Sequence, residues 1–352
     1  MHMADALISP VVGGTMLAAT AGVAAYSIKK LQNEMDEKKI PLMGVMGAFV
    51  FAAQMINFSI PGTGSSGHLG GGMLLAILLG PYAGFLTMAS ILLIQALFFG
   101  DGGLLAYGCN VFNLGFYTCF IAYPLIYKWF TRKEVTSKRI FVGSMASALV
   151  ALQLGAFSVV LETLLSGKTE LPFGKFVLLM QPIHLAIGVV EGLVTAAIVT
   201  FVWRARPEVL EKAANGEALG NISMKKVLTV LSIAVVAVGG LFSWFASANP
   251  DGLEWSIEKT AGTTELKASD GIHKVLSEIQ SKTALLPDYN FKTNESENNK
   301  EETASQAENV WPAVNAGTSV SGIVGGALTL ALAVFTGWII IVIKRKKKKI
   351  TA

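Results

Sequence analysis

The sequence predicts an all-α polytopic membrane protein with about nine transmembrane helices and one long polar extracytoplasmic loop, from composition, from the spacing of charges and from the lengths of the apolar runs. Hydrophobic residues make up 52% of the 352 residues and charged residues only 15%, against about 25% charged in soluble domains. Between positions 40 and 127 Asp101 is the only charged residue. Surface helices of a soluble protein need a polar face, so this block predicts several membrane spans.

Nine apolar stretches are candidate spans by their length. One long block is divided at Gly80 and Pro81, because a proline removes a hydrogen bond from a helix interior. The half before Gly80 is too short to cross a bilayer alone. The nine stretches are 11–28, 41–60, 69–79, 81–99, 104–127, 140–165, 176–203, 227–248 and 317–343.

The basic residues predict the orientation of these spans. They gather at 29–39, 128–139, 204–226 and 344–349, and lysine and arginine in short loops favour the cytoplasmic side. With nine spans and an outside N-terminus, all four clusters and the C-terminus are cytoplasmic, whereas omitting one span separates them. We therefore expect a multi-pass protein of the cell (inner) membrane in contact with lipid, and no nucleic-acid partner.

Charge also predicts the domain organisation. Residues 249–312 carry twelve acidic residues and six lysines, a balance of −6 in a chain whose net charge is +4. We expect a first membrane domain at 1–205, a cytoplasmic linker at 206–226, and a second part at 227–352 with two spans around the extracytoplasmic loop 249–312. Within that loop, the pattern predicts disorder around 294–302, one amphipathic helix at 271–286, and His273 at the surface.

The first two residues predict a metal site. No lysine or arginine precedes the first apolar stretch, as a signal peptide would require, so we expect Met1 to be retained. The Met1 amine, the His2 backbone nitrogen and the His2 ring nitrogen nearer the backbone can close two chelate rings in one plane around an ion. Planar nitrogen coordination suits Ni(II) or Cu(II), and a fourth position is left for another imidazole. The alternative is an incidental histidine at a frayed terminus.

A glycine-dense loop at 61–72 carries the best candidate for that fourth ligand. Glycine permits close backbone approach and positive φ, so the loop can line a cavity and direct His68 toward His2. Ser65 and Ser66 are then candidates to hold the imidazole ring from behind. The alternative is a plain flexible loop.

Other polar residues of the apolar stretches have open roles. His184 and Glu191 lie seven residues apart on one span and on one helical face, where they either form a transfer path for an ion or brace helices. Asp101 is expected in a turn, and Glu162 at a solvated membrane boundary. We expect three further residues to line the cavity around the site: Asp5, Asn110 and Asn113.

These motifs resemble a known family. The N-terminal residues 1–10, the Gly67-His68-Leu69-Gly70-Gly71 loop and the segment 184–191 together resemble the substrate-binding membrane subunit of cobalt/nickel energy-coupling-factor transporters, the CbiM/NikM type. Residues 249–255, Asn-Pro-Asp-Gly-Leu-Glu-Trp, are similar to the CbiN/NikN-type accessory subunit, here fused to the first part.

The resemblance implies a function. It implies Ni²⁺ or Co²⁺ as the transported substrate, held by Met1, His2 and His68, with no organic cofactor. It also implies a transmembrane coupling subunit and cytoplasmic ATPase subunits as partners. The chain has no Gly-x-x-x-x-Gly-Lys-Ser/Thr phosphate loop, so we expect ATP hydrolysis in those partners and no enzymatic activity in this chain.

Two other functions fit parts of the sequence. Gly64-Ser65-Ser66-Gly67 matches a Gly-x-Ser-Gly pattern of intramembrane serine proteases, with Ser66 as nucleophile and His184 as base. A structural membrane subunit without a site of its own is the second alternative. Replacing Ser66 by alanine would abolish a protease and leave metal uptake nearly unchanged, whereas replacing His2 by alanine should abolish uptake.

Overall fold

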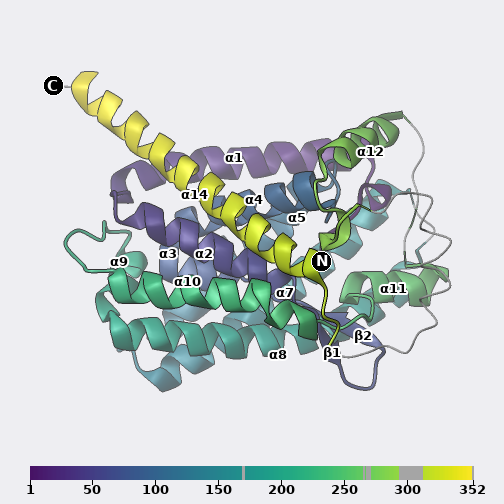
Figure 1. The fold of residues 1–352 in the computed structure, drawn as a ribbon, viewed down its shortest axis with the longest axis horizontal. Helices are drawn as coiled ribbons and strands as arrows, with labels where there is room; N and C mark the ends of the chain where they lie inside the picture. Colours follow the sequence, from purple (N-terminus) through teal and green to yellow (C-terminus); the bar gives the residue numbers. More distant parts are fainter. Residues whose placement is uncertain (169–170, 265, 267–270, 293–311, 351–352) are drawn as a thin grey trace.

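Long apolar helices, lying side by side, form the body of the protein (Figure 1). The computed structural model describes residues 1–168, 171–264, 266, 271–292 and 312–350. Six helical stretches of the described residues are long and apolar enough to cross a bilayer, which makes the chain a multi-pass membrane protein. They are Pro10–Gln32, Pro81–Phe99, Tyr107–Thr131, Ser137–Ser166, Phe173–Ala205 and Ala316–Lys346.

Each of the nine predicted stretches contains helix, although three of these helices are short. The predicted break is confirmed, because one helix ends at Leu79, Gly80 has a φ of 81°, and the next helix begins at Pro81. The helices in chain order are α1 (Pro10–Glu34), α2 (Lys39–Gln54), α3 (Gly72–Leu79), α4 (Pro81–Ile94), α5 (Tyr107–Val111), α6 (Lys128–Thr131), α7 (Ser137–Ser166), α8 (Phe173–Ala205), α9 (Pro207–Asn215), α10 (Lys225–Gly240), α11 (Gly252–Ala261), α12 (Gly271–Thr283) and α14 (Ala316–Ile350).

Shorter segments complete these helices. The π-helical segment η2 (Gln95–Phe99) extends α4, and η3 (Phe112–Tyr127) joins α5 to α6. Three single turns of 3₁₀ helix are η1 (Asp5–Leu7), η4 (Phe242–Phe245) and η5 (Pro287–Tyr289). Of the nine stretches, those of α2, α3 and α10 have 16, 8 and 16 helical residues, fewer than the roughly 20 that a span needs, so their crossing stays a prediction.

The second part of the chain packs onto the first. Helices α10 and α14 contact each other and both lie against α2. Gly239 of α10 faces Gly322 of α14, and a Cβ at Gly239 would stand 3.1 Å from the Gly322 carbonyl carbon. Small residues let membrane helices approach closely, so this glycine pair sets the α10–α14 distance.

One expectation for the fold was incomplete, because the protein is not entirely α-helical. Helix α2 ends at Gln54, and a short antiparallel hairpin follows, with β1 (Phe58–Ile60) paired to β2 (Ser65–Gly67). The predicted glycine-dense loop therefore begins as a hairpin. Gly62 and Gly64 supply the turn, since both have positive φ values, of 76° and 73°.

Residues of the predicted polar loop also fold more than expected. Helix α12 confirms the amphipathic helix predicted at 271–286, but α11 was not predicted. Asp251 caps α11 by accepting hydrogen bonds from the Leu253 and Glu254 amides, and Glu254 accepts one from the Asp251 amide. This capping box is visible in the sequence as Asp-x-x-Glu. The tract around 294–302 lies outside the described residues.

Two residues expected near solvent are buried. His273 of α12 is 2% exposed, and its Nε2 lies 2.8 Å from the Ile8 carbonyl oxygen. Glu162 of α7 is 4% exposed and accepts a hydrogen bond from Asn113. The surface assignments were wrong because α12 packs beside the N-terminal segment, and because the end of α7 is covered by η3.

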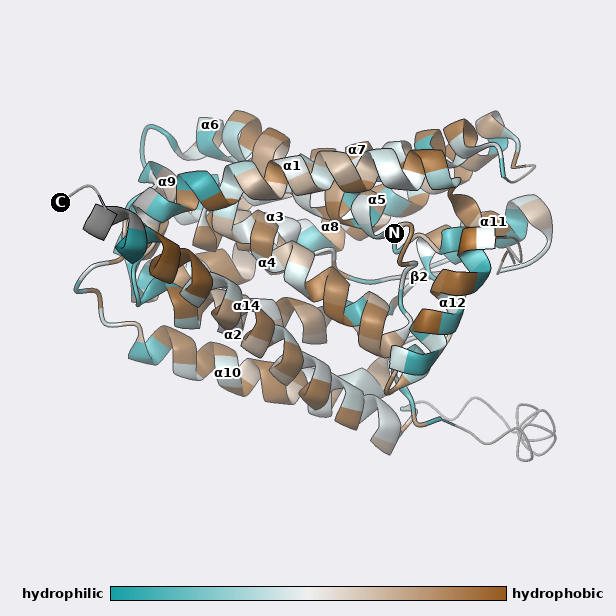
Figure 2. Ribbon diagram, turned by 90° about the horizontal axis from the view of Figure 1, so that it is seen from above, coloured by the Kyte–Doolittle hydropathy of each residue, from teal (hydrophilic) through white to brown (hydrophobic). Residues whose placement is uncertain are grey.

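The bundle has two different ends. The hairpin, α11, α12 and the N-terminus gather at one end, called here the α11 end, whereas α9 and the C-terminus lie at the other, the α9 end (Figure 1). Hydrophilic residues concentrate at both ends and hydrophobic residues cover the helices between them (Figure 2).

Candidate metal centre

The N-terminal segment is folded into the α11 end. The Met3 amide donates to Asn110 Oδ1 at 2.7 Å, and the Asn110 side-chain amide donates back to the Met3 carbonyl oxygen at 3.1 Å. Asp5 accepts hydrogen bonds from the Leu105 and Ala106 amides at 2.8 and 2.9 Å. Met1 itself is 4% exposed, so the terminal amine is inside the protein.

Asn113 is also part of this support. Its side-chain amide donates to Glu162 at 2.8 Å and lies 3.8 Å from the Met3 sulfur. Asp5, Asn110 and Asn113 thus hold the N-terminal segment through its backbone and through Met3. In this arrangement none of the three lines the two cavities described below.

One carboxylate oxygen joins the terminal amine to His68. Asp251 Oδ2 is 3.4 Å from the Met1 nitrogen and 3.5 Å from His68 Nε2. Burial by itself raises the pKa of Asp251, but the nearby terminal amine and His68 hold this pKa well below its usual range. Because Asp251 caps α11, the second part of the chain places this negative charge between two nitrogen donors.

His2 lies against His68. The two imidazole rings stack with centroids 5.0 Å apart and planes inclined by 20°. His2 Nδ1 is 2.9 Å from Asp101 Oδ1, while its Nε2 is buried without a hydrogen-bond partner among the described residues. The predicted chelate uses Nδ1, so closing it requires the ring to turn away from Asp101.

Asp101 is the second acidic partner of the site, and its role was missed when it was assigned to a turn. It follows η2, accepts a hydrogen bond from the Tyr289 hydroxyl and faces His2. Burial raises the pKa of Asp101, but the charge and hydrogen bond of His2, with the Tyr289 hydrogen bond, lower it to about 2. No spacing rule connects Asp101, Asp251 and Tyr289, which meet only through the fold.

Two cavities adjoin these residues. The small cavity, about 10 Å³ in volume, is lined by Met1, His68, His184 and Asp251 among others. The wide cavity, about 380 Å³ in volume, is lined by His2, His68, Asp101, Asp251, Glu254 and Tyr289 among others. His68 and Asp251 line both, so they separate the two spaces.

Main-chain nitrogen is needed for a metal ligand set here. Among the described residues no group of three or more His, Cys, Asp and Glu side chains is spaced to hold an ion. The Met1 amine and the His2 backbone nitrogen are main-chain donors, which add to these side chains. The residues present therefore offer two main-chain nitrogens, two stacked imidazoles and one bridging carboxylate.

The serines of the hairpin have a different role from the predicted one. Ser66 Oγ donates to the Asn249 carbonyl oxygen at 2.8 Å, and the Ser66 amide donates to the Pro250 carbonyl oxygen at 2.8 Å. Ser65 Oγ contacts the same Pro250 oxygen at 3.4 Å. Both serines tie β2 to the segment before α11 and do not hold the His68 ring. In the described structure no hydrogen bond joins Ser66 to His184, as a protease pair would need.

Glu191 braces the loop that carries His68. Its two oxygens accept hydrogen bonds from the Gly70 amide at 2.7 Å and the Gly71 amide at 3.1 Å. A bulkier residue at position 70 would collide with this carboxyl group, since a Cβ there would lie 2.9 Å from Glu191 Oε2. Of the two roles considered for Glu191, the geometry favours bracing.

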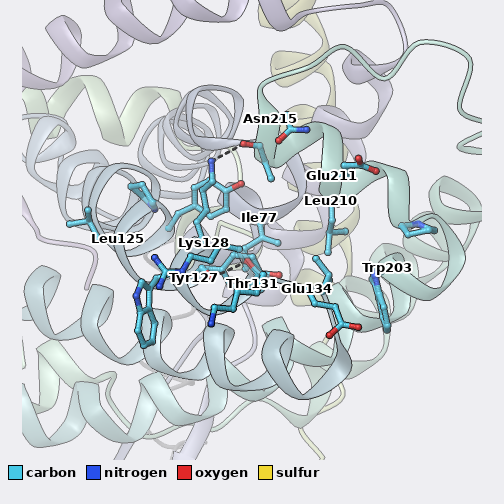
Figure 3. Close-up of a pocket in the computed structure, with 18 residues that line it drawn as sticks. Ile77, Leu125, Tyr127, Lys128, Thr131, Glu134, Trp203, Leu210, Glu211 and Asn215 are labelled. Carbon is cyan, nitrogen blue, oxygen red and sulfur yellow. Dashed lines mark hydrogen bonds between the residues drawn. The ribbon is translucent and has the colours of Figure 1, made fainter.

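The α9 end contains a third and larger cavity. This α9 cavity, about 760 Å³ in volume, opens between α6, α9 and the ends of neighbouring helices (Figure 3). Lys128, Trp129, Arg132 and Lys133 are among its lining residues. No residue of the predicted site lies there.

The fold and the donors at the α11 end define a class: a multi-pass membrane protein with an internal, nitrogen-rich site near its N-terminus. Comparison with known proteins gives the family. Residues 2–209 match the CbiM family, described as cobalt uptake substrate-specific transmembrane region, and residues 225–342 match the PDGLE domain. The chain belongs to the CbiM family, with a PDGLE domain following it.

Its relatives are metal transport proteins. A putative fused nickel transport protein NikMN of Archaeoglobus fulgidus is 34% identical over 337 residues, which cover 94% of this chain and 96% of that protein. The fused nickel transport protein NikMN of Rhodobacter capsulatus is 32% identical over 223 residues, 60% of this chain and 64% of that protein. A crystal structure of a truncated transition metal transporter is 30% identical and covers 58% of this chain and 99% of its own, with a TM-score of 0.52.

Proposed function

We propose that this chain is the substrate-specific membrane component of an ATP-driven energy-coupling-factor importer of divalent nickel or cobalt. The observation that carries the proposal is the position of the Met1 amine and His68 Nε2, both within 3.5 Å of one Asp251 oxygen, with the His2 ring stacked on His68. Nickel and cobalt transport relatives support the choice of ion.

In this proposal the ion is held on the outer side of the membrane by Met1, His2 and His68. Turning the His2 ring from Asp101 directs Nδ1 to the ion, so that the amine, the His2 backbone nitrogen and Nδ1 close the chelate. His68 Nε2 supplies the fourth nitrogen. Planar nitrogen donors favour nickel over cobalt, in agreement with the fused nickel relatives.

The second part of the chain completes this site. Asp251 brings an anionic oxygen next to two of the nitrogen ligands, and Tyr289 holds Asp101 beside His2. Two ligands that lie about 2.0–2.1 Å from one ion, at a right angle to each other, are about 2.9 Å apart. The distances from Asp251 Oδ2 to the amine and to His68 Nε2 are only slightly longer, 3.4 and 3.5 Å. A small movement therefore lets the carboxylate contact the ion. We infer that the PDGLE part helps to load the site.

The remaining components of the importer are partner proteins. A transmembrane coupling subunit and cytoplasmic ATPase subunits supply the movement and the ATP hydrolysis, because this chain has no phosphate-binding loop. The chain binds the ion outside and releases it to the cytoplasm when the partners change the arrangement of the helices.

Equilibrium binding of Ni²⁺ and Co²⁺ to the purified full chain tests the ligand assignment. We expect tight binding by the native chain and loss of binding in His2→Ala. Ser66→Ala is the matched control at the same end, because its hydroxyl contacts the Asn249 carbonyl oxygen and no proposed ligand. Unchanged affinity in His2→Ala contradicts the proposed site.

A further inference from the structure

One imidazole nitrogen beside the site has no role in the ligand set proposed above. His184 lies on α8 and is 1% exposed. Its Nδ1 is 2.8 Å from the Met180 carbonyl oxygen, which can only accept a hydrogen bond. The proton is therefore on Nδ1, and Nε2 carries a lone pair. That Nε2 is buried and has no hydrogen-bond partner in the part of the chain that the structure describes.

Among the described residues, His184 makes no hydrogen bond that braces a neighbouring helix. The Met180 carbonyl oxygen belongs to the same helix, one turn before His184. The Nδ1 contact therefore fixes the ring on α8 and links it to no other element. A buried acceptor without a partner costs free energy, so the position of Nε2 calls for a group that it can bind.

The small cavity provides space for such a group. Met1, His68, His184 and Asp251 all line it. Its volume of about 10 Å³ matches the space that one water-sized sphere occupies. His184 thus lines a space for a single small particle together with two of the proposed ligands, Met1 and His68, and with Asp251 between them.

The start of α11 keeps this space small and close to His184. Gly252 follows Asp251, and a Cβ at Gly252 would lie 3.3 Å from His184 Cε1 and in collision with Ile183. Only a residue without a side chain lets α11 begin over the cavity. The same turn therefore brings Asp251 to the amine and covers the imidazole of His184.

We propose that His184 Nε2 is a further ligand of the transported ion. A histidine that donates its other ring N–H to a backbone carbonyl has the hydrogen bonding typical of metal-binding histidines. This inference rests on the proposed function, because it takes Met1 and His68 as ligands of the same ion. It adds an imidazole from a membrane-spanning helix to the N-terminal donors.

Ion binding requires a local adjustment. Since no three side chains of this kind stand at ligand spacing among the described residues, the ring of His68 turns toward the small cavity when the ion binds, while His184 keeps its hydrogen bond to Met180. The ion then contacts α8 directly. A movement of α8 relative to the N-terminal segment would consequently pull one ligand away and weaken the site.

X-ray absorption at the nickel edge tests the number of imidazole ligands. The purified full chain is loaded with one equivalent of Ni²⁺ alone, as native protein and as His184→Gln. We expect scattering from three imidazoles in the native chain, His2, His68 and His184, and from two in the variant, with an affinity at least about tenfold lower. The same number of imidazoles in both proteins overturns the proposal.

His273→Gln is the matched control. His273 is also buried and also contacts a backbone carbonyl oxygen, that of Ile8, but it lines neither the small nor the wide cavity. We expect this variant to keep three imidazoles. If His273→Gln loses an imidazole as His184→Gln does, the loss reports general damage and the assignment to His184 fails.

The native chain gives a second measurement that needs no variant to fold. Two imidazoles in the native protein, with binding that depends on His2, overturn the role of His184 and leave the proposed function standing. A native chain that binds neither Ni²⁺ nor Co²⁺ overturns both. Three imidazoles in the native protein support both.

Discussion

The two ends of the bundle hold cavities of opposite character. At the α11 end, the small and wide cavities have volumes of about 10 and 380 Å³, and their linings include histidines, aspartates and Met1. At the α9 end, a cavity of about 760 Å³ is lined by Lys128, Arg132 and Lys133 together with tryptophans. Glu134 and Glu211 also line this space, so its basic residues are partly balanced by carboxylates, and its described lining includes no histidine. The proposed imidazole ligands lie at the α11 end, around the two smaller spaces.

What distinguishes the α11 end is the convergence of separate segments. The N-terminal segment, the loop after β2, α8 and the start of α11 all contribute lining residues to the small cavity, among them Met1, His68, His184 and Asp251. At the α9 end, Lys128 instead donates to the Ala214 carbonyl oxygen at 2.8 Å, and Arg132 lies 5.6 Å from the Trp129 ring. Those cations are engaged in local packing.

Displacing the terminal amine should cause the largest loss of nickel affinity at the α11 end. Adding one glycine before Met1 moves the amine away from the chelate while every side chain is retained. We expect nickel affinity to fall by more than about 100-fold, or about 2.8 kcal/mol. Calorimetric titration of the purified extended chain measures this, and an unchanged dissociation constant contradicts the amine as a ligand.

Asp251→Asn tests the contribution of the second part of the chain. It removes the charge that lies 3.4 Å from the amine and 3.5 Å from His68, so we expect a loss of affinity of about 10- to 100-fold. Glu278→Gln is the matched control, because it also removes one carboxylate from the PDGLE part, at an exposed position of α12. An equal effect of both variants would show that only overall charge matters.

Apolar periodicity and charge predicted much of this architecture. The break at Gly80 and Pro81 follows from what proline does to a helix, and helix α12 follows from its periodicity. The hairpin could not be predicted, because Ser65, Ser66 and Gly67 have no strand pattern of their own. Their pairing depends on contacts with the Asn249 and Pro250 carbonyl oxygens, about 180 residues further along the chain.

The residues of the site were predicted to different degrees. His2 and His68 follow from ligand chemistry and from the glycine-dense loop. Asp251 could have been suspected from the capping box that it forms with Glu254. Asp101 could not, since it stands in a Gly-Asp-Gly-Gly turn sequence and meets His2 only through tertiary folding.

A smaller loss of nickel affinity is expected from Glu191→Gln. This variant distinguishes a role of Glu191 in bracing the loop from a role in binding the ion. One of the Gly70 and Gly71 amides loses its acceptor, and an unpaired buried donor costs about 1–3 kcal/mol. We therefore expect a lower midpoint of thermal unfolding in detergent and only a modest loss of nickel affinity, through a displaced His68. Loss of binding with unchanged thermal stability would instead identify Glu191 as a residue of the ion path.

The smallest effect should come from the α9 cavity. Lys133→Ala removes one positive charge there without touching the α11 end, and the two ends are separated by the length of the helices (Figure 1). Charges separated by more than the Debye length of about 8 Å are largely screened in physiological salt when they are exposed. Nickel affinity should therefore stay within about twofold of the native value, measured by the same titration. If this substitution weakened binding as strongly as Asp251→Asn does, a charge far from the proposed ligands would matter as much as one beside them. That result would contradict the assignment of the ion to the α11 end.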